Sequence, residues 1–321
     1  DLNIPSLAED ECIGSCDWTR RVENTSDETL TWSVSIGGPP GFSGSIEPPV
    51  FTLGPGETQD IAIEIQVTAK AADGEWNFGS INLDETSGNH PDAHWPFAII
   101  PISSNYPANL DIEARTTSGS VVLEDLVSRN ISDFHTEVTG LKKADRHAFT
   151  LTQDNDTSAD FPDIFFDDPT TTQFVPVTVP ADSFSVIADI VETSSPDLDM
   201  LLFLDADADG PDLDDVGDSS ENPAACQSAS GGSSEFCEIL SPTPGTYYVA
   251  IINFSQNKDG GDPIDLATAV IPVDGADEGN LTVNGPATVT DNSPYSVTVN
   301  YDEPGMTAID RLYGYFTVGS D

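Results

Sequence analysis

The feature that most constrains the fold of this chain is a repeated pattern of short β-rich runs, each followed by Gly, Pro, Asn or Asp. Residues 59–67, Gln-Asp-Ile-Ala-Ile-Glu-Ile-Gln-Val, alternate between apolar and polar side chains, which is typical of an antiparallel strand with one buried face. Helical periodicity is almost absent, and only residues 121–128 fit either a short helix or a strand. Further strand-like runs lie at 29–36, 95–102, 246–254 and 295–301. The sequence therefore predicts an all-β protein of tandem antiparallel β-sandwiches.

Length and two polar segments suggest how the chain divides. Its 321 residues are enough for two or three domains, each with a core of its own. A boundary at 103–107 predicts a first sandwich over residues 1–104, and a second boundary at 274–279 ends a second sandwich, residues 105–274, which has an N-terminal extension. Residues 275–321 carry too few strand signals for an independent sandwich. They form either a partial third module or strands that complete a sheet begun by residues 108–150.

The charge excludes several kinds of partner. The chain has 56 acidic and 10 basic residues, a net charge of -46, and only Lys258 and Arg311 are basic beyond residue 150. Such a field repels nucleic acid and anionic membranes, so we expect neither as a partner. Divalent cations or a salty medium would relieve the self-repulsion. The chain opens on no signal-peptide pattern and contains no apolar run of membrane-spanning length, which favours a mature piece of a larger protein.

The four cysteines form two local pairs, Cys12 with Cys16 and Cys226 with Cys237. In an acidic β protein rich in Thr, Ser and Asn, this spacing predicts two disulfides and an oxidising, extracellular compartment. Each would close a short loop and add about 2–3 kcal/mol on the chain-entropy model. The alternative, a four-cysteine zinc site, requires a two-residue spacing that neither pair has.

The segment Asp205-Ala-Asp207-Ala-Asp209-Gly210 carries the clearest chemical signal. Carboxylates at alternate positions followed by glycine can wrap oxygen ligands around a calcium ion. It is not an EF-hand, because Val216 occupies the twelfth position and a β-run precedes the loop. Further acidic side chains could add ligands: Asp212, Asp214, Asp215 and Asp218. The alternative is a solvated acidic loop of a salt-adapted protein.

Catalytic machinery is not recognisable. Neither a Gly-Thr-Ser-Met turn nor a Gly-x-Ser-x-Gly elbow occurs, and catalysis needs a nucleophile, a base and an oxyanion site together. His90 and His94 have a zinc-binding spacing only if they lie on a helix, and the neighbouring prolines predict a hairpin loop instead. Tyr313 and Tyr315 share one strand face and are candidates for contact with a polymeric substrate, with core packing as the alternative.

Five segments of the first hundred residues have a recognisable order: Leu2-Asn3-Ile4-Pro5-Ser6-Leu7, Trp18-Thr19-Arg20-Arg21-Val22-Glu23-Asn24, Phe51-Thr52-Leu53-Gly54-Pro55-Gly56-Glu57, Asp73-Gly74-Glu75-Trp76-Asn77-Phe78-Gly79-Ser80-Ile81 and His94-Trp95-Pro96-Phe97-Ala98. Together and in this order they resemble the fibronectin type III-like domain that follows the catalytic domain in many subtilisin-like serine proteases. The Cys12–Cys16 loop and the residue before Pro96 depart from the plant form of that domain.

A second set of motifs lies within residues 172–270: Asp197-Leu198-Asp199-Met200-Leu201-Leu202-Phe203, the Cys226 and Cys237-Glu238 positions, and Pro244-Gly245-Thr246-Tyr247-Tyr248-Val249. With these motifs, residues 172–270 resemble the bacterial pre-peptidase C-terminal domain, a small β-sandwich carried by secreted proteases. Two protease-associated modules in tandem imply a non-catalytic C-terminal accessory region of a secreted subtilisin-like serine endopeptidase. Such a region would support stability, secretion or the binding of an extracellular protein substrate, and its partner would be a catalytic domain upstream.

A function of another class remains open. A calcium-dependent adhesion protein or a carbohydrate-binding surface protein can be built from similar sandwiches. An upstream Asp/His/Ser catalytic domain in the reading frame would favour the protease, and further repeats or a surface anchor would favour adhesion.

Overall fold

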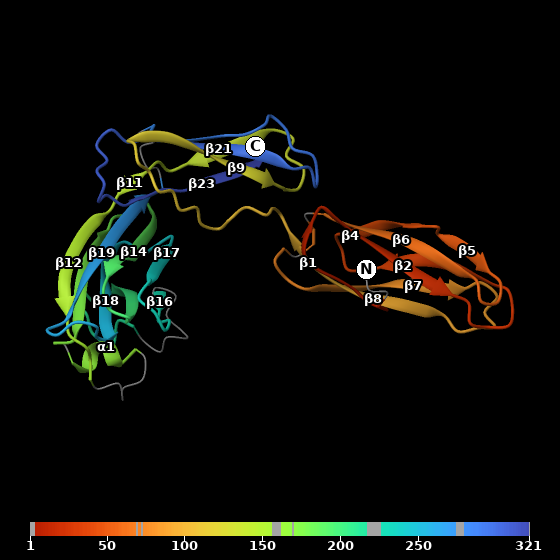
Figure 1. The fold of residues 1–321 in the computed structure, drawn as a ribbon, viewed down its shortest axis with the longest axis horizontal. Coiled ribbons are helices and arrows are strands. Elements are labelled where there is room, and N and C mark those ends of the chain that lie inside the picture. Colours follow the sequence, from red (N-terminus) through yellow and green to blue (C-terminus); the bar gives the residue numbers. More distant parts are fainter. Residues whose placement is uncertain are drawn as a thin grey trace.

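The computed structural model describes residues 4–68, 70–71, 73–155, 162–168, 170–216, 226–273 and 279–320. Almost all regular structure in these ranges is β-strand, arranged in several sheets whose strands pair antiparallel, apart from one parallel pair in the first sheet, and the single helix α1 (Ile164–Asp167) has four residues. The all-β fold of tandem sandwiches is therefore confirmed (Figure 1). In the described ranges no helix is long and apolar enough to cross a membrane.

The first sandwich packs a five-stranded sheet, in the order β1-β8-β7-β3-β5, against a three-stranded sheet, β2-β6-β4. Its core is formed by inward-facing side chains such as Ile61, Ile63 and Ile65 of β6, which are at most 1 % exposed, and Phe97 of β8. The alternation of residues 59–67 thus places one face of β6 in the core. The strands are β1 (Leu7–Ile13), β2 (Ser15–Glu23), β3 (Leu30–Gly37), β4 (Phe42–Glu47), β5 (Val50–Leu53), β6 (Thr58–Val67), β7 (Asn77–Glu85) and β8 (Ala93–Ile102).

A second unit, which we call the discontinuous module, combines residues 103–143 with residues 279–320. Its central sheet, β20-β21-β9, pairs Val121 with Val299, and its smaller sheets pair β10 with β23 and β11 with β22. Leu126, Val283 and Val299 belong to its small buried core. The strands are β9 (Ser118–Leu126), β10 (Phe134–Val138), β11 (Lys142–Lys143), β20 (Leu281–Asn284), β21 (Tyr295–Asp302), β22 (Leu312–Tyr313) and β23 (Phe316–Ser320).

The described residues between 145 and 272 form a third unit, the inserted sandwich, which lies between the two halves of the discontinuous module in the sequence. Its two four-stranded sheets have the orders β12-β19-β14-β17 and β13-β18-β15-β16. Tyr247, Leu198 and Val249 are fully buried between them. The strands are β12 (Asp145–Leu151), β13 (Thr172–Val179), β14 (Ser183–Thr193), β15 (Asp197–Asp205), β16 (Cys226–Ser228), β17 (Phe236–Leu240), β18 (Gly245–Ser255) and β19 (Asp262–Pro272).

Of residues 121–128, which suited helix or strand, residues 121–126 belong to β9, because pairing with β21 supplies the backbone partners of an extended segment. The pairing of β9 with β21 also shows where the last part of the chain goes: its strands join those of residues 103–143. The expected boundary at 103–107 coincides with the start of the exposed segment that leaves β8. Most of the expected boundary at 274–279 lies outside the described residues.

Candidate metal centre

The acidic loop, residues 205–216, begins where β15 leaves its sheet. Leu201 and Phe203 of this strand are at most 1 % exposed, and the strand pairs with β18 as far as Asp205. Asp205 is partly buried at the end of the strand, whereas Asp207 and Asp209 are exposed. A hydrophobic strand therefore places three alternate carboxylates at its end.

Asp205, Asp207 and Asp209 each offer a carboxylate oxygen within 4.8 Å of the other two. Oxygens that bind one calcium ion at 2.3–2.6 Å can be no more than about 5.2 Å apart, so this spacing fits a shared calcium ion. The backbone N–H of Ala208 donates to Asp205 Oδ1 at 2.8 Å, and the N–H of Asp209 donates to Asp207 Oδ1 at 3.3 Å. Ala208 and Gly210 have φ angles of 65° and 115°, a region in which glycine is favoured. The donor set is hard oxygen, as calcium requires.

The far end of the loop is fixed by two buried residues. Val216 is fully buried in a cluster with Phe165 of α1 and Phe203 of β15. Asp215 is 4 % exposed, and its carboxylate accepts the N–H groups of Ala206 at 2.7 Å and Asp212 at 3.4 Å. The loop is thus closed by hydrogen bonds to its own backbone.

Like charges raise proton affinity in this loop. The pKa of Asp209 is raised, first by a hydrogen bond and the negative charge of Asp207 and further by Asp212 and Asp205. The pKa of Asp215 is raised mainly because its carboxyl group is buried. A cation bound between Asp205, Asp207 and Asp209 would favour the charged form of Asp209 and of the neighbouring Asp215, and would therefore lower both pKa values.

The predicted ligands do not all converge. Asp205, Asp207 and Asp209 come together, and Asp212 is near enough for its charge to act on Asp209. The Asp212 carboxylate accepts the N–H of Asp214 at 2.9 Å. Asp214 is exposed and is not part of the cluster found in the described ranges. Asp218 lies outside the described residues.

A second acidic group, which sequence reasoning missed, surrounds Asp199 on β15. Burial, together with the negative charges of Asp197 and Glu235, raises the pKa of Asp199 to about 7. Glu235 is 1 % exposed and accepts hydrogen bonds from Ser230, at 2.9 Å, and from Ser228. Alternation along β15 could have placed Asp197 and Asp199 on one face, but nothing local indicates that Glu235 joins them.

Both disulfides join the pairs expected from the sequence. Cys12 and Cys16 link β1 to β2 across Gly14, with Cα atoms 5.8 Å apart, and Cys226 and Cys237 link β16 to β17, with Cα atoms 5.6 Å apart. The Cys226–Cys237 bond lies in the inserted sandwich, just beyond the acidic loop in sequence. It therefore connects the edge strands of the two sheets of that sandwich.

Tyr313 and Tyr315 lie between the discontinuous module and the inserted sandwich. Tyr313 donates to Asp189 Oδ2 at 2.5 Å, and Tyr315 hydrogen-bonds to Glu238 and to Ser185 Oγ, the latter at 2.9 Å. Both rings pack beside a buried cluster that includes Ile187. In this structure the two side chains contact their own chain, and substrate contact by them stays a prediction.

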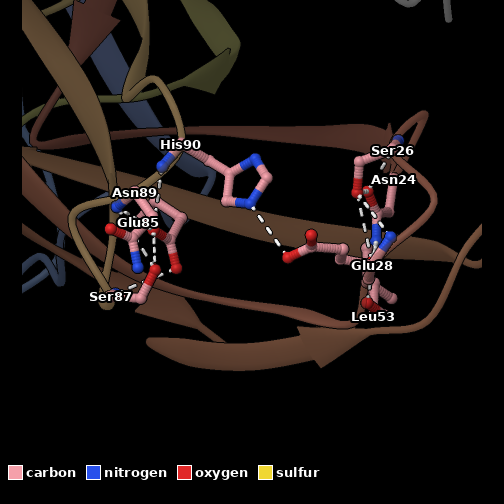
Figure 2. Close-up of polar contacts among 8 residues, drawn as sticks. All are labelled: Asn24, Ser26, Glu28, Leu53, Glu85, Ser87, Asn89 and His90. Carbon is pink, nitrogen blue, oxygen red and sulfur yellow. Dashed lines mark hydrogen bonds and ion pairs between the residues drawn. The ribbon is translucent and has the colours of Figure 1, made fainter.

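His90 and His94 lie in the β7–β8 hairpin region rather than on a helix. His90 Nε2 is 3.3 Å from Glu28 Oε2 (Figure 2). The neighbouring Glu85 is 6 % exposed, and its carboxylate accepts hydrogen bonds from Ser87 Oγ at 2.6 Å and from the N–H groups of Ser87, Asn89 and His90. These bonds, above all those from Ser87, lower the pKa of Glu85 to about 2. The arrangement is a carboxylate that orders a turn.

The Thr19-Arg20-Arg21-Val22-Glu23-Asn24 segment has two structural anchors. Arg20 is 7 % exposed, and its guanidinium donates to the carbonyls of Ile4, Ser6 and Thr19 at 2.8–3.0 Å. Asn24 is 2 % exposed and holds the loop after β2 (Figure 2). The two side chains therefore tie β2 to the chain entry and to the next loop.

Comparison with known proteins bears on the sandwich that carries these anchors. Residues 1–99 match the Fibronectin type-III domain family. The chain is also 27 % identical over 89 residues to subtilisin-like protease SBT2.5 of Arabidopsis thaliana, over 28 % of this chain and 11 % of that protein. The matched part is thus about a tenth of the length of the curated relative. The chain contains a domain of a kind found in subtilisin-like proteases, and no catalytic domain is evidenced in it.

Solved structures also resemble the chain. The secreted serine protease VesC of Vibrio cholerae is similar over 83 % of this chain and 49 % of its own, with 8 % identity and a TM-score of 0.26. Tripeptidyl peptidase 2 is similar over 90 % of this chain and 20 % of its own, with 10 % identity and a TM-score of 0.25. At these TM-scores the likeness carries no inference.

Proposed function

We propose that this chain is a non-catalytic accessory region of an extracellular subtilisin-like serine endopeptidase. The observation that carries the proposal is the Fibronectin type-III match over residues 1–99, together with the 27 % identity to a subtilisin-like protease over 89 residues. The region supports the stability or secretion of a catalytic domain upstream, or binds an extracellular protein substrate. The resemblance of residues 172–270 to a pre-peptidase C-terminal domain and two disulfides suited to an oxidising compartment support the same assignment.

The reading frame upstream of Asp1 tests the proposal most directly. We expect it to encode an Asp/His/Ser catalytic domain of the subtilisin type. The purified chain alone should not hydrolyse casein, because no nucleophile–base pair is recognisable in its sequence. A frame that holds only further sandwiches or a surface anchor would refute the proposal, as would casein cleavage by the pure chain that a serine-directed inhibitor abolishes.

Within this function we assign calcium to Asp205, Asp207 and Asp209. We expect a dissociation constant of about 10⁻⁴–10⁻³ M, as in other extracellular modules. At 10 mM calcium, binding to the folded state alone stabilises it by about 1.4–2.7 kcal/mol. That corresponds to a rise of about 4–10 °C in the melting temperature of a sandwich of this size.

A matched pair of double variants separates binding from charge relief. Asp207→Asn with Asp209→Asn removes two loop carboxylates, whereas Asp111→Asn with Glu113→Gln removes two exposed negative charges outside the loop. The calcium-dependent shift should disappear only in the first pair. If it survives there, or if magnesium or sodium chloride gives the same shift in the unchanged chain, calcium is not bound in this loop.

One observation favours carbohydrate binding as a second candidate. Trp76 is 49 % exposed and Phe78 is 68 % exposed, and residues two apart on an extended segment point to the same side. Two exposed aromatic rings close together, one on β7 and one directly before it, can pack against a sugar polymer. Binding to an insoluble neutral polysaccharide that is lost in Trp76→Ala with Phe78→Ala would support this candidate, and equal binding by both proteins would exclude this face.

A further inference from the structure

The sequence contains five Asn-x-Ser/Thr triplets with a residue other than proline in the middle, beginning at Asn24, Asn130, Asn155, Asn253 and Asn280. This triplet is the acceptor pattern for N-linked glycans in secreted proteins. The triplet at Asn155 runs into residues 156–161, which lie outside the described ranges. The structure separates the other four into one accessible position and three inaccessible ones.

Asn130 is an exposed residue in the connection between β9 and β10. The N–H groups of Ile131 and Val289 donate to each other's carbonyls at 2.9 and 2.8 Å, and the Ile131 side chain is only 6 % exposed. Because side chains alternate along an extended segment, burial of Ile131 directs its two neighbours to the opposite side. Asn130 and Ser132 are accordingly both exposed. The amide and the hydroxyl that the acceptor pattern requires therefore face solvent together.

The position of Asn130 does not depend on its side chain. Its backbone N–H donates to Asp291 Oδ1 at 2.5 Å, and the adjacent Arg129 pairs with Asp73 of the first sandwich. Within the described ranges, no hydrogen bond engages the Asn130 side-chain amide. A substituent on Nδ2 would thus break no hydrogen bond found among the described residues.

The amides of the other three triplets are held inside the protein. Asn24, Asn253 and Asn280 are 2 %, 0 % and 5 % exposed. Asn253 Nδ2 donates to the carbonyl of Leu151 at 3.1 Å and to Asp262 at 3.4 Å.

Asn280 Nδ2 donates to the carbonyl of Leu141 at 3.0 Å and to Glu303 at 2.9 Å. Asn24 Nδ2 likewise donates to two carbonyls, those of Glu28 and Leu53. Each buried amide nitrogen therefore has both of its donors in use, and a glycan there would require local unfolding.

We infer that Asn130 is an N-glycosylation acceptor of the folded protein, and that Asn24, Asn253 and Asn280 are not. The donor is a lipid-pyrophosphate-linked oligosaccharide. A bond forms between Asn130 Nδ2 and C1 of the first sugar, the bond from C1 to the pyrophosphate oxygen breaks, and the lipid pyrophosphate leaves with the electron pair. Nδ2 releases one proton, so atoms and charge balance. The inference rests on the extracellular location proposed above, since this modification belongs to a secretory route.

A glycan at Asn130 would stand beside the junction of the first sandwich with the discontinuous module. In that junction Arg129 pairs with Asp73, and Asn292 Nδ2 donates to the Ser15 carbonyl at 3.2 Å. The acidic loop belongs to the inserted sandwich, a different unit of the chain (Figure 1). The modification would therefore cover the inter-module contact and leave the candidate metal centre open.

The test compares transfer to the folded and the unfolded chain. The purified folded chain is incubated with a single-subunit oligosaccharyltransferase and a lipid-pyrophosphate-linked oligosaccharide, and site occupancy is measured by peptide mass spectrometry. The same chain is treated after reduction and denaturation. We expect occupancy at Asn130 in both states, and at least a tenfold lower occupancy at Asn24, Asn253 and Asn280 in the folded state than in the unfolded one.

Two variants control the assignment. Asn130→Gln removes the acceptor, and Ser132→Ala removes the hydroxyl while the amide stays; each should abolish transfer at this position without changing the tryptophan emission of the folded chain. The inference is overturned if the folded chain is no more modified at Asn130 than at the buried sites, or if Asn130 is unmodified in both states. Neither outcome affects the accessory-region proposal, which the upstream reading frame decides.

Discussion

Replacing Asn24 should uncouple the loop after β2 from the core of the first sandwich. Its Nδ2 donates to the carbonyls of Glu28 at 2.7 Å and Leu53 at 2.9 Å, and its Oδ1 accepts from Ser26 N at 3.0 Å and Ser26 Oγ at 2.8 Å (Figure 2). Asn24→Ala removes all four hydrogen bonds. The groups of Ser26 and Glu28 can turn to water, but the Leu53 carbonyl is bonded in a buried setting.

The magnitude follows from this difference. An unsatisfied buried carbonyl costs about 1–3 kcal/mol, and each hydrogen bond that water can replace contributes about 0.5–1.5 kcal/mol or less. We therefore expect Asn24→Ala to lower the free energy of unfolding of the first sandwich by about 2–4 kcal/mol. Asn24→Asp keeps the acceptor but places a carboxylate oxygen, in place of the Nδ2 donor, against the carbonyls of Glu28 and Leu53. It should therefore be at least as destabilising as Asn24→Ala at neutral pH. Part of the lost stability should return in acid, when the carboxyl group is protonated and can donate.

The full-length chain suits the measurement, because all four tryptophans, Trp18, Trp32, Trp76 and Trp95, lie in the first sandwich. Tryptophan emission in a urea titration therefore reports on that unit alone. With a slope of about 1.5 kcal/mol per molar urea, a loss of 3 kcal/mol lowers the midpoint by about 2 M.

Asn89→Ala is the matched control. Asn89 is exposed, and its contact with Glu85 uses the backbone N–H, which the substitution keeps. We expect a change within about 0.5 kcal/mol. If Asn24→Ala shifts the urea midpoint no more than Asn89→Ala, the four hydrogen bonds do not hold the loop to the sandwich and the reasoning is refuted.

Three further predictions concern acidic groups and a disulfide. The pKa of Asp199, raised to about 7, means that the folded state binds the extra proton, so the inserted sandwich should lose stability as pH rises from about 4 to about 7. The unscreened shift corresponds to about 4 kcal/mol, and solvent screening reduces it to about 2 kcal/mol. Asp199→Asn should flatten this pH dependence, measured by calorimetry because the inserted sandwich contains no tryptophan. An unchanged slope of stability against pH would contradict the prediction. The pKa of Glu85, lowered to about 2, has the opposite sign: its stabilisation is present above about pH 4.5 and lost toward pH 2. Glu85→Gln should therefore reduce the acid sensitivity of the tryptophan-monitored transition. If the variant is as sensitive to acid as the unchanged chain, the Glu85 carboxylate does not stabilise the turn. Replacing Cys226 and Cys237 with serine should destabilise the inserted sandwich by about 2–3 kcal/mol, and an unchanged calorimetric transition would show that this disulfide adds nothing.

Several features of the protein could be predicted because their signals are local. The alternation of residues 59–67 indicated a half-buried strand, and Ile61, Ile63 and Ile65 of β6 are at most 1 % exposed. The disulfide pairs followed from proximity in sequence, since short loops close at the lowest entropic cost. The alternate aspartates of the acidic loop come together for the same reason. In each case the interacting groups are a few residues apart, so the backbone itself limits where they can go.

Other features depend on which distant surfaces meet, and the sequence does not specify this locally. Val121 faces Val299 only because β9 pairs with β21, although the whole inserted sandwich separates the two strands in the sequence. Many short strands with similar alternation compete for each sheet edge, and burial of apolar surface over the whole molecule selects among them. The same selection brings Tyr315 to Glu238, Glu235 to Asp199, and Arg20 to the carbonyls of the chain entry. The tertiary packing also decides in which glycosylation triplets the asparagine amide is buried. The Asn-x-Ser/Thr pattern is identical in kind at Asn24 and Asn130, and only the tertiary packing, which buries one amide and exposes the other, distinguishes them.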